Sequence, residues 1–277
     1  MQVRLECIPC FARQSVAAAR LATDDVELQE QIIRAALRLV TQADFSATPF
    51  EIGQLVHRAA RDLSGREDPY LAIKQRSNAY AVAKLPELNR LVAQAENPLM
   101  IATKIAITGN LMDFGVPNNG LDIQATLARV LDTPFAVDDF GVFARRLAEA
   151  KRVLYLADNA GEIVFDGVLI EQLDCPEVTV VVKDEPFIND AMQADAESAG
   201  FGGGVHILAA PLYPRSSPAF QAAWAAADLI ISKGQANYEA YSEVGGPLFY
   251  LLVAKCDCVA DEFGVRVGEM ILQASQH

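Results

Sequence analysis

The stretch that decides the fold is Leu154-Tyr155-Leu156-Ala157-Asp158-Asn159-Ala160-Gly161-Glu162, residues 154–162 of the chain. It begins with an apolar run typical of a buried strand, continues with the adjacent oxygen ligands Asp158 and Asn159, and opens a helical pattern after Gly161. A helix N-terminus offers unpaired backbone N–H groups and the positive end of the helix dipole. A metal ion held by the two side chains would therefore share a phosphate with the first helical turn. The segment indicates phosphate chemistry.

The overall composition is that of a globular protein with an excess of negative charge. The 277 residues are 52% hydrophobic and 21% charged, which provides enough apolar material for a substantial core. The formal net charge is −13 at pH 7. Binding to a nucleic-acid backbone needs a basic face, so this charge argues against nucleic acid as a partner and favours a small substrate or a metal ion.

The start of the chain and its cysteines bear on location. The chain begins Met1-Gln2-Val3-Arg4-Leu5-Glu6-Cys7, without the basic segment and apolar run of a secretory signal, and it has no uninterrupted apolar run of about 18 residues. We therefore expect a cytoplasmic protein that does not enter a membrane. Its five cysteines are an odd number, which fits a reducing compartment better than a disulfide framework. We expect no structural disulfide, and the oligomeric state is left open.

The first half of the chain carries the period of amphipathic helices. Apolar residues recur at spacings of three and four in the segments 14–21, 27–43, 49–63, 69–95, 99–108, 121–131 and 140–150. Turn residues mark loops at 64–69 and 115–120. We place a helical N-terminal domain over residues 1–98 and an α/β domain over residues 99–277.

After Lys151 the period changes to that of a sheet with crossover helices. Short apolar runs typical of strands alternate with helical segments, at 153–156, 178–182, 205–208, 229–231 and 248–254. This alternation predicts an α/β fold with a parallel sheet, in which ligands gather beyond the carboxyl ends of the strands. The residues just after the strands are Asp158, Asn159, Lys183, Asp184, Lys233, Gly234, Lys255 and Cys256.

Asp158 and Asn159 are the first candidates for metal ligands, because Mg²⁺ and Mn²⁺ prefer side-chain oxygens. Asp190 follows the second strand of the α/β region and opens the next helix, so it supplies a third oxygen at the same sheet edge. The alternative is that these residues cap helices, for which Asp and Asn are favoured. Spacing alone leaves both interpretations open.

Two further positions carry polar groups suited to a phosphate. Lys233 directly follows the apolar run 229–231 and precedes Gly234, so its charge is placed to stabilise a phosphoryl group during transfer. A solvated surface lysine is the alternative. Asn110 and Asp113 are three residues apart, a spacing that puts both on one face of a helix. A helix end at Gly109 followed by a cap explains the same pattern.

The pair Cys7 and Cys10 has the CxxC spacing of metal and redox sites. Structural zinc needs further ligands, for which Cys256 and Cys258 are candidates, and thioredoxin-like chemistry needs a βαβ setting that this part of the sequence lacks. Whether the pair binds a second metal is left open. With only three histidines, the chain has little material for a histidine-based catalytic triad.

Six segments of the chain form a pattern found together in one family. They are Cys7-Ile8-Pro9-Cys10, Asp68-Pro69-Tyr70, Gly109-Asn110 with Asp113, Asp158-Asn159-Ala160-Gly161-Glu162, Lys183-Asp184 with Asn189-Asp190, and Lys233-Gly234-Gln235-Ala236-Asn237-Tyr238-Glu239. This pattern resembles the DUF89 proteins, the damage-control phosphatases, over nearly the whole chain. The resemblance is greatest to the stand-alone prokaryotic branch, in which the N-terminal CxxC is common. One departure is Ala236, at a position that is often glycine or a small polar residue.

The resemblance implies a helical N-terminal region and a Rossmann-like, three-layer α/β region with a mainly parallel sheet. It also implies a divalent-metal-dependent phosphatase acting on a small phosphorylated metabolite, such as a sugar phosphate, a phosphopantetheine derivative or a damaged nucleotide. Carried over residue by residue, the metal ligands are Asp158, Asn159 and Asp190. The groups near the phosphate are Lys233 and Asn110, with Asp113, Gly161 and Asn237 as further substrate contacts.

Two mechanisms fit these residues. In the favoured one, a divalent metal (Mn²⁺, Mg²⁺, Co²⁺ or Ni²⁺) polarises the phosphoryl oxygens and positions a water, while Lys233 offsets the charge that develops at phosphorus. In the other, Asp158 attacks to form an aspartyl-phosphate. An aspartate that holds the metal has lone pairs already committed, so direct attack by water ranks higher.

Two other functions are alternatives to the phosphatase hypothesis. An S-adenosylmethionine-dependent methyltransferase or nucleotide-dependent enzyme suits the fold class, but the turn after the first strand lacks the GxGxxG glycine spacing that those cofactors need. A non-enzymatic metal-binding protein is the second alternative, and the CxxC pair keeps it open. Turnover of a phosphate ester separates that protein from an enzyme.

Overall fold

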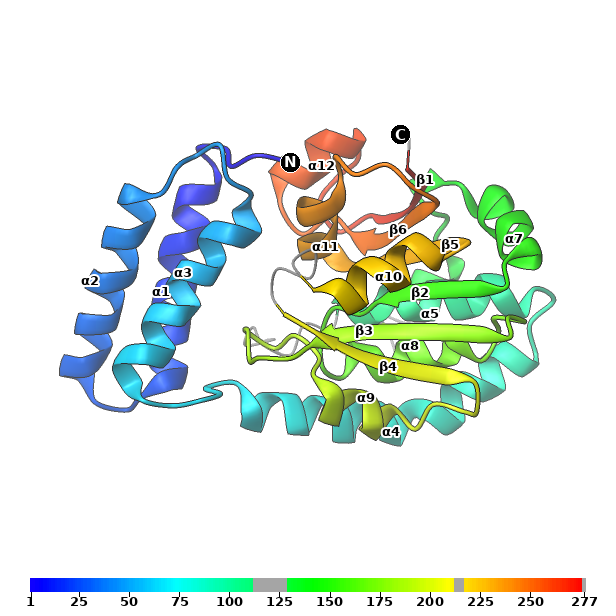
Figure 1. Cartoon of the computed structure of the whole chain (residues 1–277), viewed down its shortest axis with the longest axis horizontal. Coiled ribbons are helices and arrows are strands. Elements are labelled where there is room, and N and C mark those ends of the chain that lie inside the picture. Colours follow the sequence, from blue (N-terminus) through cyan, green and yellow to red (C-terminus); the bar gives the residue numbers. More distant parts are fainter. Residues whose placement is uncertain (112–128, 212–216, 276–277) are drawn as a thin grey trace.

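A seven-stranded sheet forms the centre of the computed structural model, which describes residues 1–111, 129–211 and 217–275 and only the backbone of residues 110 and 111 (Figure 1). The strands are β1 (Val137–Asp138), β2 (Arg152–Leu156), β3 (Glu177–Lys183), β4 (Val205–Ala210), β5 (Leu229–Lys233), β6 (Leu248–Val253) and β7 (Met270–Ala274). Their order is β1-β7-β6-β5-β2-β3-β4, and every neighbouring pair is parallel except β6 with β7. The predicted strands and the mainly parallel sheet are confirmed.

The central strands are buried on both faces. Along β2, Val153 and Tyr155 face one core while Leu154 and Leu156 face the other, as the two-residue period of a strand requires. The first core is covered by α4 (Leu71–Ala93), α5 (Pro98–Leu111), α7 (Phe140–Glu149), α8 (Glu162–Ile170) and α9 (Gln193–Ala199). The second is covered by α10 (Pro218–Ala226), α11 (Gly234–Tyr241) and α12 (Asp257–Phe263). Covering both faces produces three layers and explains why the strands read as continuous apolar runs.

Three N-terminal helices pack on one another beside the sheet (Figure 1). They are α1 (Cys7–Ala22), α2 (Val26–Gln42) and α3 (Pro49–Ser64), which we call the N-terminal bundle. Helix α3 begins in a capping box, in which the Thr48 hydroxyl accepts from the Glu51 N–H and the Glu51 carboxylate accepts from the Thr48 N–H. It ends at Gly65, which adopts the left-handed conformation. Local sequence signals thus define both ends of this helix.

Helix α4 contacts α5, α8 and α9 of the α/β region, and it lies along the lower edge of the sheet in Figure 1. The domain boundary predicted after residue 98 separates α4 from these partners. The boundary after residue 98 stays a prediction. The packing of α4 on α5, α8 and α9 favours a boundary between α3 and α4. The predicted loop at 64–69 lies at this point of the chain.

The N-terminal bundle docks on the loop that follows β3. The rings of Phe50 and Phe187 meet edge to face with their centroids 5.2 Å apart. From α3, the Arg61 guanidinium donates to the backbone carbonyl of Pro186 at 2.8 Å. Asp190 lies a few residues further along the same loop. The bundle therefore supports a segment that carries one of the predicted metal ligands.

Several elements differ from the sequence prediction. Helix α1 begins at Cys7, so the CxxC pair lies in its first turn and the helix is longer than the predicted segment 14–21. Strands β1 and β7 were not predicted, because β1 has two residues and both strands depend on pairing across a long sequence separation, such as Val137 with Ile271. The helix predicted at 121–131 lies mostly outside the described residues. Over the described parts of the chain, no helix has the length and apolar character needed to cross a membrane.

Candidate active site

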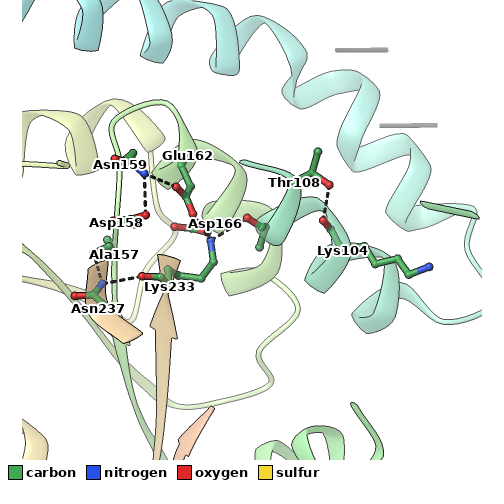
Figure 2. Close-up of polar contacts among 10 residues, drawn as sticks. Lys104, Thr108, Ala157, Asp158, Asn159, Glu162, Asp166, Lys233 and Asn237 are labelled. Carbon is green, nitrogen blue, oxygen red and sulfur yellow. Dashed lines mark hydrogen bonds and ion pairs between the residues drawn. The ribbon is translucent and has the colours of Figure 1, made fainter. Parts of the chain in front are cut away.

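The candidate site lies where the order of the strands reverses. From β2 the chain continues to β3 and β4 on one side, whereas β5 and β6 lie on the other side. Such a switch point opens a crevice beyond the carboxyl ends of the strands, where α/β proteins bind ligands. Asp158 and Asn159 follow β2, and Lys233 ends the neighbouring strand β5. Figure 2 shows these segments, which are far apart in the sequence, side by side.

The side chain of Asp158 lies against the backbone of Gly234. Gly234 has φ +79°, and a Cβ atom at this position would overlap the Asp158 carboxylate. Glycine is needed here both for the left-handed backbone and for the close approach. Asp158 itself is buried, with 6% of its surface exposed. The β5–α11 turn is thus shaped around this carboxylate.

The third predicted ligand, Asp190, is held beside the first two by backbone pairing. Asn159 and Asp190 form an isolated antiparallel bridge, and the N–H of Ala191 donates to the carbonyl of Asp158 at 2.8 Å. Asp190 is buried as well, and its carboxylate lies 3.8 Å from the ammonium of Lys183. The structure therefore brings together the segments of all three predicted metal ligands, with a lysine at their edge.

The carboxamide of Asn159 lies between two carboxylates (Figure 2). Its Nδ2 donates to Oδ2 of Asp158 at 2.8 Å and to Oε2 of Glu162 at 2.9 Å. Asn159 is 6% exposed, so these bonds form in an environment where an unpaired polar group would be costly. Both protons of the amide are used in this arrangement.

Lys233 points into the protein, towards helix α8 (Figure 2). Its ammonium donates to Oε1 of Glu162 at 2.7 Å, to Oδ1 of Asp166 at 2.5 Å and to the carbonyl of Ala106 at 2.9 Å. Three acceptors use all three N–H groups of a lysine. The predicted contact between Lys233 and a phosphate therefore has no donor left in this arrangement, and Lys233 is fully buried.

Burial and charge act in opposite directions on this cluster. Burial alone lowers the pKa of Lys233, but the charges of Asp166 and Glu162 raise it above its ordinary value. Burial raises the pKa of Asp166, and the nearby Lys233 charge opposes that shift. Lys233 is thus held as a cation inside the protein. An ion pair of this kind is tolerated when the remaining lone pairs and protons are also bonded.

Two other predicted substrate contacts have structural partners. The N–H of Gly161 donates to the side-chain oxygen of Asn78 on α4 at 2.7 Å. Asn237 on α11 donates from Nδ2 to the carbonyl of Lys233 at 2.8 Å and to that of Ala157 at 3.1 Å, which ties the ends of β5 and β2 together. Both residues shape the site, and their roles as substrate contacts stay predictions.

The remaining predicted residues are Asn110 and Asp113. The backbone of Asn110 lies in the last turn of α5, but its side chain lies outside the described part of the structure, as does the whole of Asp113. Their predicted places near a phosphate stay predictions.

Sequence reasoning missed the residues that surround Lys233. The motif at 158–162 includes Glu162 but gives it no role, and no motif of the sequence includes Asp166. The two are four residues apart on α8, a spacing that places both side chains on one face of a helix, so a signal was present. Asn78 had no such signal, because its partners Gly161 and Asp195 are distant in the sequence.

The cysteine pair lies apart from this site, in the first turn of α1. The thiol of Cys7 is buried against that of Cys258 on α12, and burial raises the pKa of Cys258 to about 12. All five cysteines are free thiols. Over the described residues, no three His, Cys, Asp or Glu side chains are arranged to hold a metal ion. The candidate site above differs, since it combines two carboxylates with an amide.

Comparison with known proteins gives a family for this arrangement. Residues 3–271 match the model of the damage-control phosphatase ARMT1-like domain. The chain is 32% identical to the damage-control phosphatase PH1575 of Pyrococcus horikoshii, with 98% of this chain and 97% of the relative covered. It is 31% identical to a damage-control phosphatase of Archaeoglobus fulgidus, with 98% of each covered.

A solved structure agrees with the sequence relatives. The crystal structure of a DUF89 family protein from Pyrococcus horikoshii superposes with a TM-score of 0.89 at 29% identity, over 100% of both chains. The match therefore extends to the N-terminal bundle as well as the sheet. The chain belongs to the damage-control phosphatase ARMT1-like family, also called DUF89.

Proposed function

We propose that this protein is a divalent-metal-dependent phosphatase that hydrolyses small phosphate esters, such as surplus or damaged phosphometabolites. The family supports phosphatase activity, because relatives that match over nearly their whole length are named damage-control phosphatases. The observation that carries the proposal is the buried oxygen set of Asp158, Asn159 and Asp190 at the switch point of the sheet.

The donor set fits a hard divalent cation. Asp158, Asn159 and Asp190 offer carboxylate and amide oxygens, which suit Mg²⁺ and Mn²⁺, and Co²⁺ and Ni²⁺ also accept such ligands. When bound, the cation would polarise the phosphoryl oxygens and activate a water molecule. The turn at Gly234 and the backbone bridge at Asp190 hold two of the ligands in place before the cation arrives.

Positive charge for the phosphate comes from a different lysine than the sequence suggested. Lys233 is enclosed by its three acceptors, whereas Lys183 ends β3 at the same sheet edge, and its ammonium lies 3.8 Å from Asp190. We assign to Lys183 the neutralisation of charge that develops on the phosphoryl oxygens. Attack by water is favoured over attack by Asp158, because the lone pairs of Asp158 would be committed to the metal and its Oδ2 also accepts a hydrogen bond from Asn159.

The test is phosphate release from a panel of sugar phosphates, phosphopantetheine derivatives and nucleotides by metal-stripped protein, with each divalent cation added back. Wild type is expected to release phosphate only with metal. Asp158→Ala is expected to lose at least about 100-fold in rate, while the exposed control Asp174→Ala keeps the wild-type rate. Metal binding without release from any ester would instead indicate a metal-binding protein, and release without metal would contradict the proposed chemistry.

The same panel tests Lys183. The variant Lys183→Met is expected to lower kcat/KM by about 100-fold, because the positive charge that stabilises the transferring phosphoryl group is lost. The control is Lys151→Met, since Lys151 is exposed and directly precedes β2, at the opposite end of the strands from the site. Equal activity of the two variants would remove Lys183 from the proposed mechanism.

A further inference from the structure

The cluster of Lys233, Glu162 and Asp166 is too deeply buried to meet a substrate. The side chains of Lys233 and Asp166 are 0% exposed and that of Glu162 is 1% exposed. A hydrogen bond from Nδ2 of Asn159 to Oε2 of Glu162 links the cluster to the predicted ligands. The cluster is therefore connected to the predicted metal ligands through Asn159.

The surroundings of Asn159 determine which end of its carboxamide points outward. A carboxamide has a donor end, Nδ2, and an acceptor end, Oδ1. Asp158 and Glu162 both approach it within 2.9 Å with carboxylate oxygens, which only accept. If the amide were rotated by half a turn, Oδ1 would face two negative oxygens without a proton between them. Nδ2 therefore faces the carboxylates, and Oδ1 faces away from both.

We propose that Glu162, held by Lys233, is a positioning residue that locks the Asn159 carboxamide with Oδ1 presented to a divalent cation. The inference rests on the proposed function, because it assumes that Asn159 is a metal ligand. It adds a residue behind the ligand set and a role for the buried lysine. Outer partners of this kind orient metal ligands and determine much of the metal affinity.

Lys233 stabilises the buried carboxylate of Glu162. A buried carboxylate without a counter-charge is costly, and Lys233 supplies that charge at 2.7 Å. The third N–H of Lys233 donates to the carbonyl of Ala106, so Lys233 is bonded to α5 as well as to α8. The orientation of Asn159 is thereby coupled to the packing of two helices against the sheet.

The test compares two variants with the same change of charge in the same cluster. In Glu162→Gln, the amide oxygen keeps the bond to Lys233, and the amide nitrogen then meets the donor end of Asn159, so Asn159 must rotate. In Asp166→Asn, the Lys233 cluster loses the same charge without any contact to Asn159. Mn²⁺ affinity, measured by electron paramagnetic resonance of free Mn²⁺, is expected to fall 10–100-fold in Glu162→Gln and by less than about 3-fold in Asp166→Asn.

A measurement on the metal-free protein separates orientation from charge. The side-chain NH₂ signals of Asn159, assigned by their absence in Asn159→Asp, are expected to shift and exchange faster in Glu162→Gln but not in Asp166→Asn. Equal Mn²⁺ affinities of the two variants, or unchanged Asn159 signals in Glu162→Gln, would overturn the positioning role alone. Failure of the wild-type protein to bind Mn²⁺ would overturn both this role and the proposed function.

Discussion

At the scale of single residues, Gly234 shows how one position shapes the site. Its φ of +79° and the overlap of any Cβ with the Asp158 carboxylate exclude other residues without rearrangement. We expect Gly234→Ala to lower the free energy of unfolding by about 1–2 kcal/mol for the left-handed backbone and by a further ~1–3 kcal/mol for the overlap. We also expect it to abolish Mn²⁺ binding, because Asp158 is displaced.

The matched control is Gly264→Ala. Gly264 has φ +65° at the end of α12, with open space around the position of a Cβ. This variant carries only the backbone cost of about 1–2 kcal/mol and binds Mn²⁺ as wild type does. Urea unfolding and Mn²⁺ titration of both variants check the prediction. Wild-type Mn²⁺ affinity in Gly234→Ala would show that the contact with Asp158 does not matter for the site.

The residues around Asp158 also show how far single positions were predictable. The strand pattern placed Asp158, Asn159 and Asp190 at one edge of the sheet, and the family resemblance predicted them as metal ligands; the structure brings their segments together. The direction of the Lys233 side chain was not predictable from its position after a strand, because it depends on Glu162 and Asp166 of another element. A lysine after a strand can point outward to a ligand or inward to a carboxylate, and only its neighbours decide between the two.

At the scale of elements, Asn78 joins three helices near the site. From α4 its oxygen accepts from the N–H of Gly161 at the start of α8, and its Nδ2 donates to Asp195 of α9 at 2.6 Å. We expect Asn78→Ala to lower the free energy of unfolding by about 1–3 kcal/mol, because it leaves a buried N–H and a buried carboxylate oxygen without this partner. Urea denaturation measures the change. The exposed Ser198→Ala on α9 is the control and is expected to stay within about 0.5 kcal/mol of wild type.

The hydrogen bond between Asn78 and Gly161 reduces the number of free N–H groups that the N-terminus of α8 offers to an anion. The sequence suggested that the first turn after Gly161 offers free N–H groups to a phosphate. In the structure the Gly161 N–H is already bonded to Asn78, and that of Ile163 is bonded to the carbonyl of Asn159. If Asn78→Ala keeps wild-type stability, the bond to Gly161 contributes little and the N–H would be available to a ligand.

At the scale of the whole molecule, His57 lies where the N-terminal bundle meets the α/β region. Its ring packs edge to face on Phe187, with the centroids 5.5 Å apart, and its nitrogens approach Gln14 and Tyr70 at 3.3 Å. Burial lowers the pKa of His57 from 6.5 to about 4. The folded protein therefore keeps this ring neutral at pH values where the unfolded chain would protonate it.

This difference predicts a loss of stability in acid. Well above pH 6.5 the ring is neutral in both states and contributes no pH dependence. As the pH falls through 6.5 towards 4, the unfolded chain binds the proton and the folded protein does not, so stability falls. At pH 5 the loss amounts to about 2 kcal/mol relative to pH 7.5. Denaturant unfolding at the two pH values checks it, with His57→Phe as the comparison because it removes the titrating group and keeps an aromatic ring. An equal loss in the variant would assign the acid sensitivity to other groups.

The sequence by itself determined what depends on neighbours along the chain. Helix and strand periods predicted the helical first half and the parallel sheet, and the motif at 154–162 predicted the place of the site, because these signals arise from contacts within a few residues. Only the tertiary structure decided that α4 packs with the α/β region, that β7 runs antiparallel to β6, and that Lys233 points inward. These features depend on which distant segment lies alongside, and the energies that choose it, burial of apolar surface and pairing of buried charges, exist only once the chain has folded.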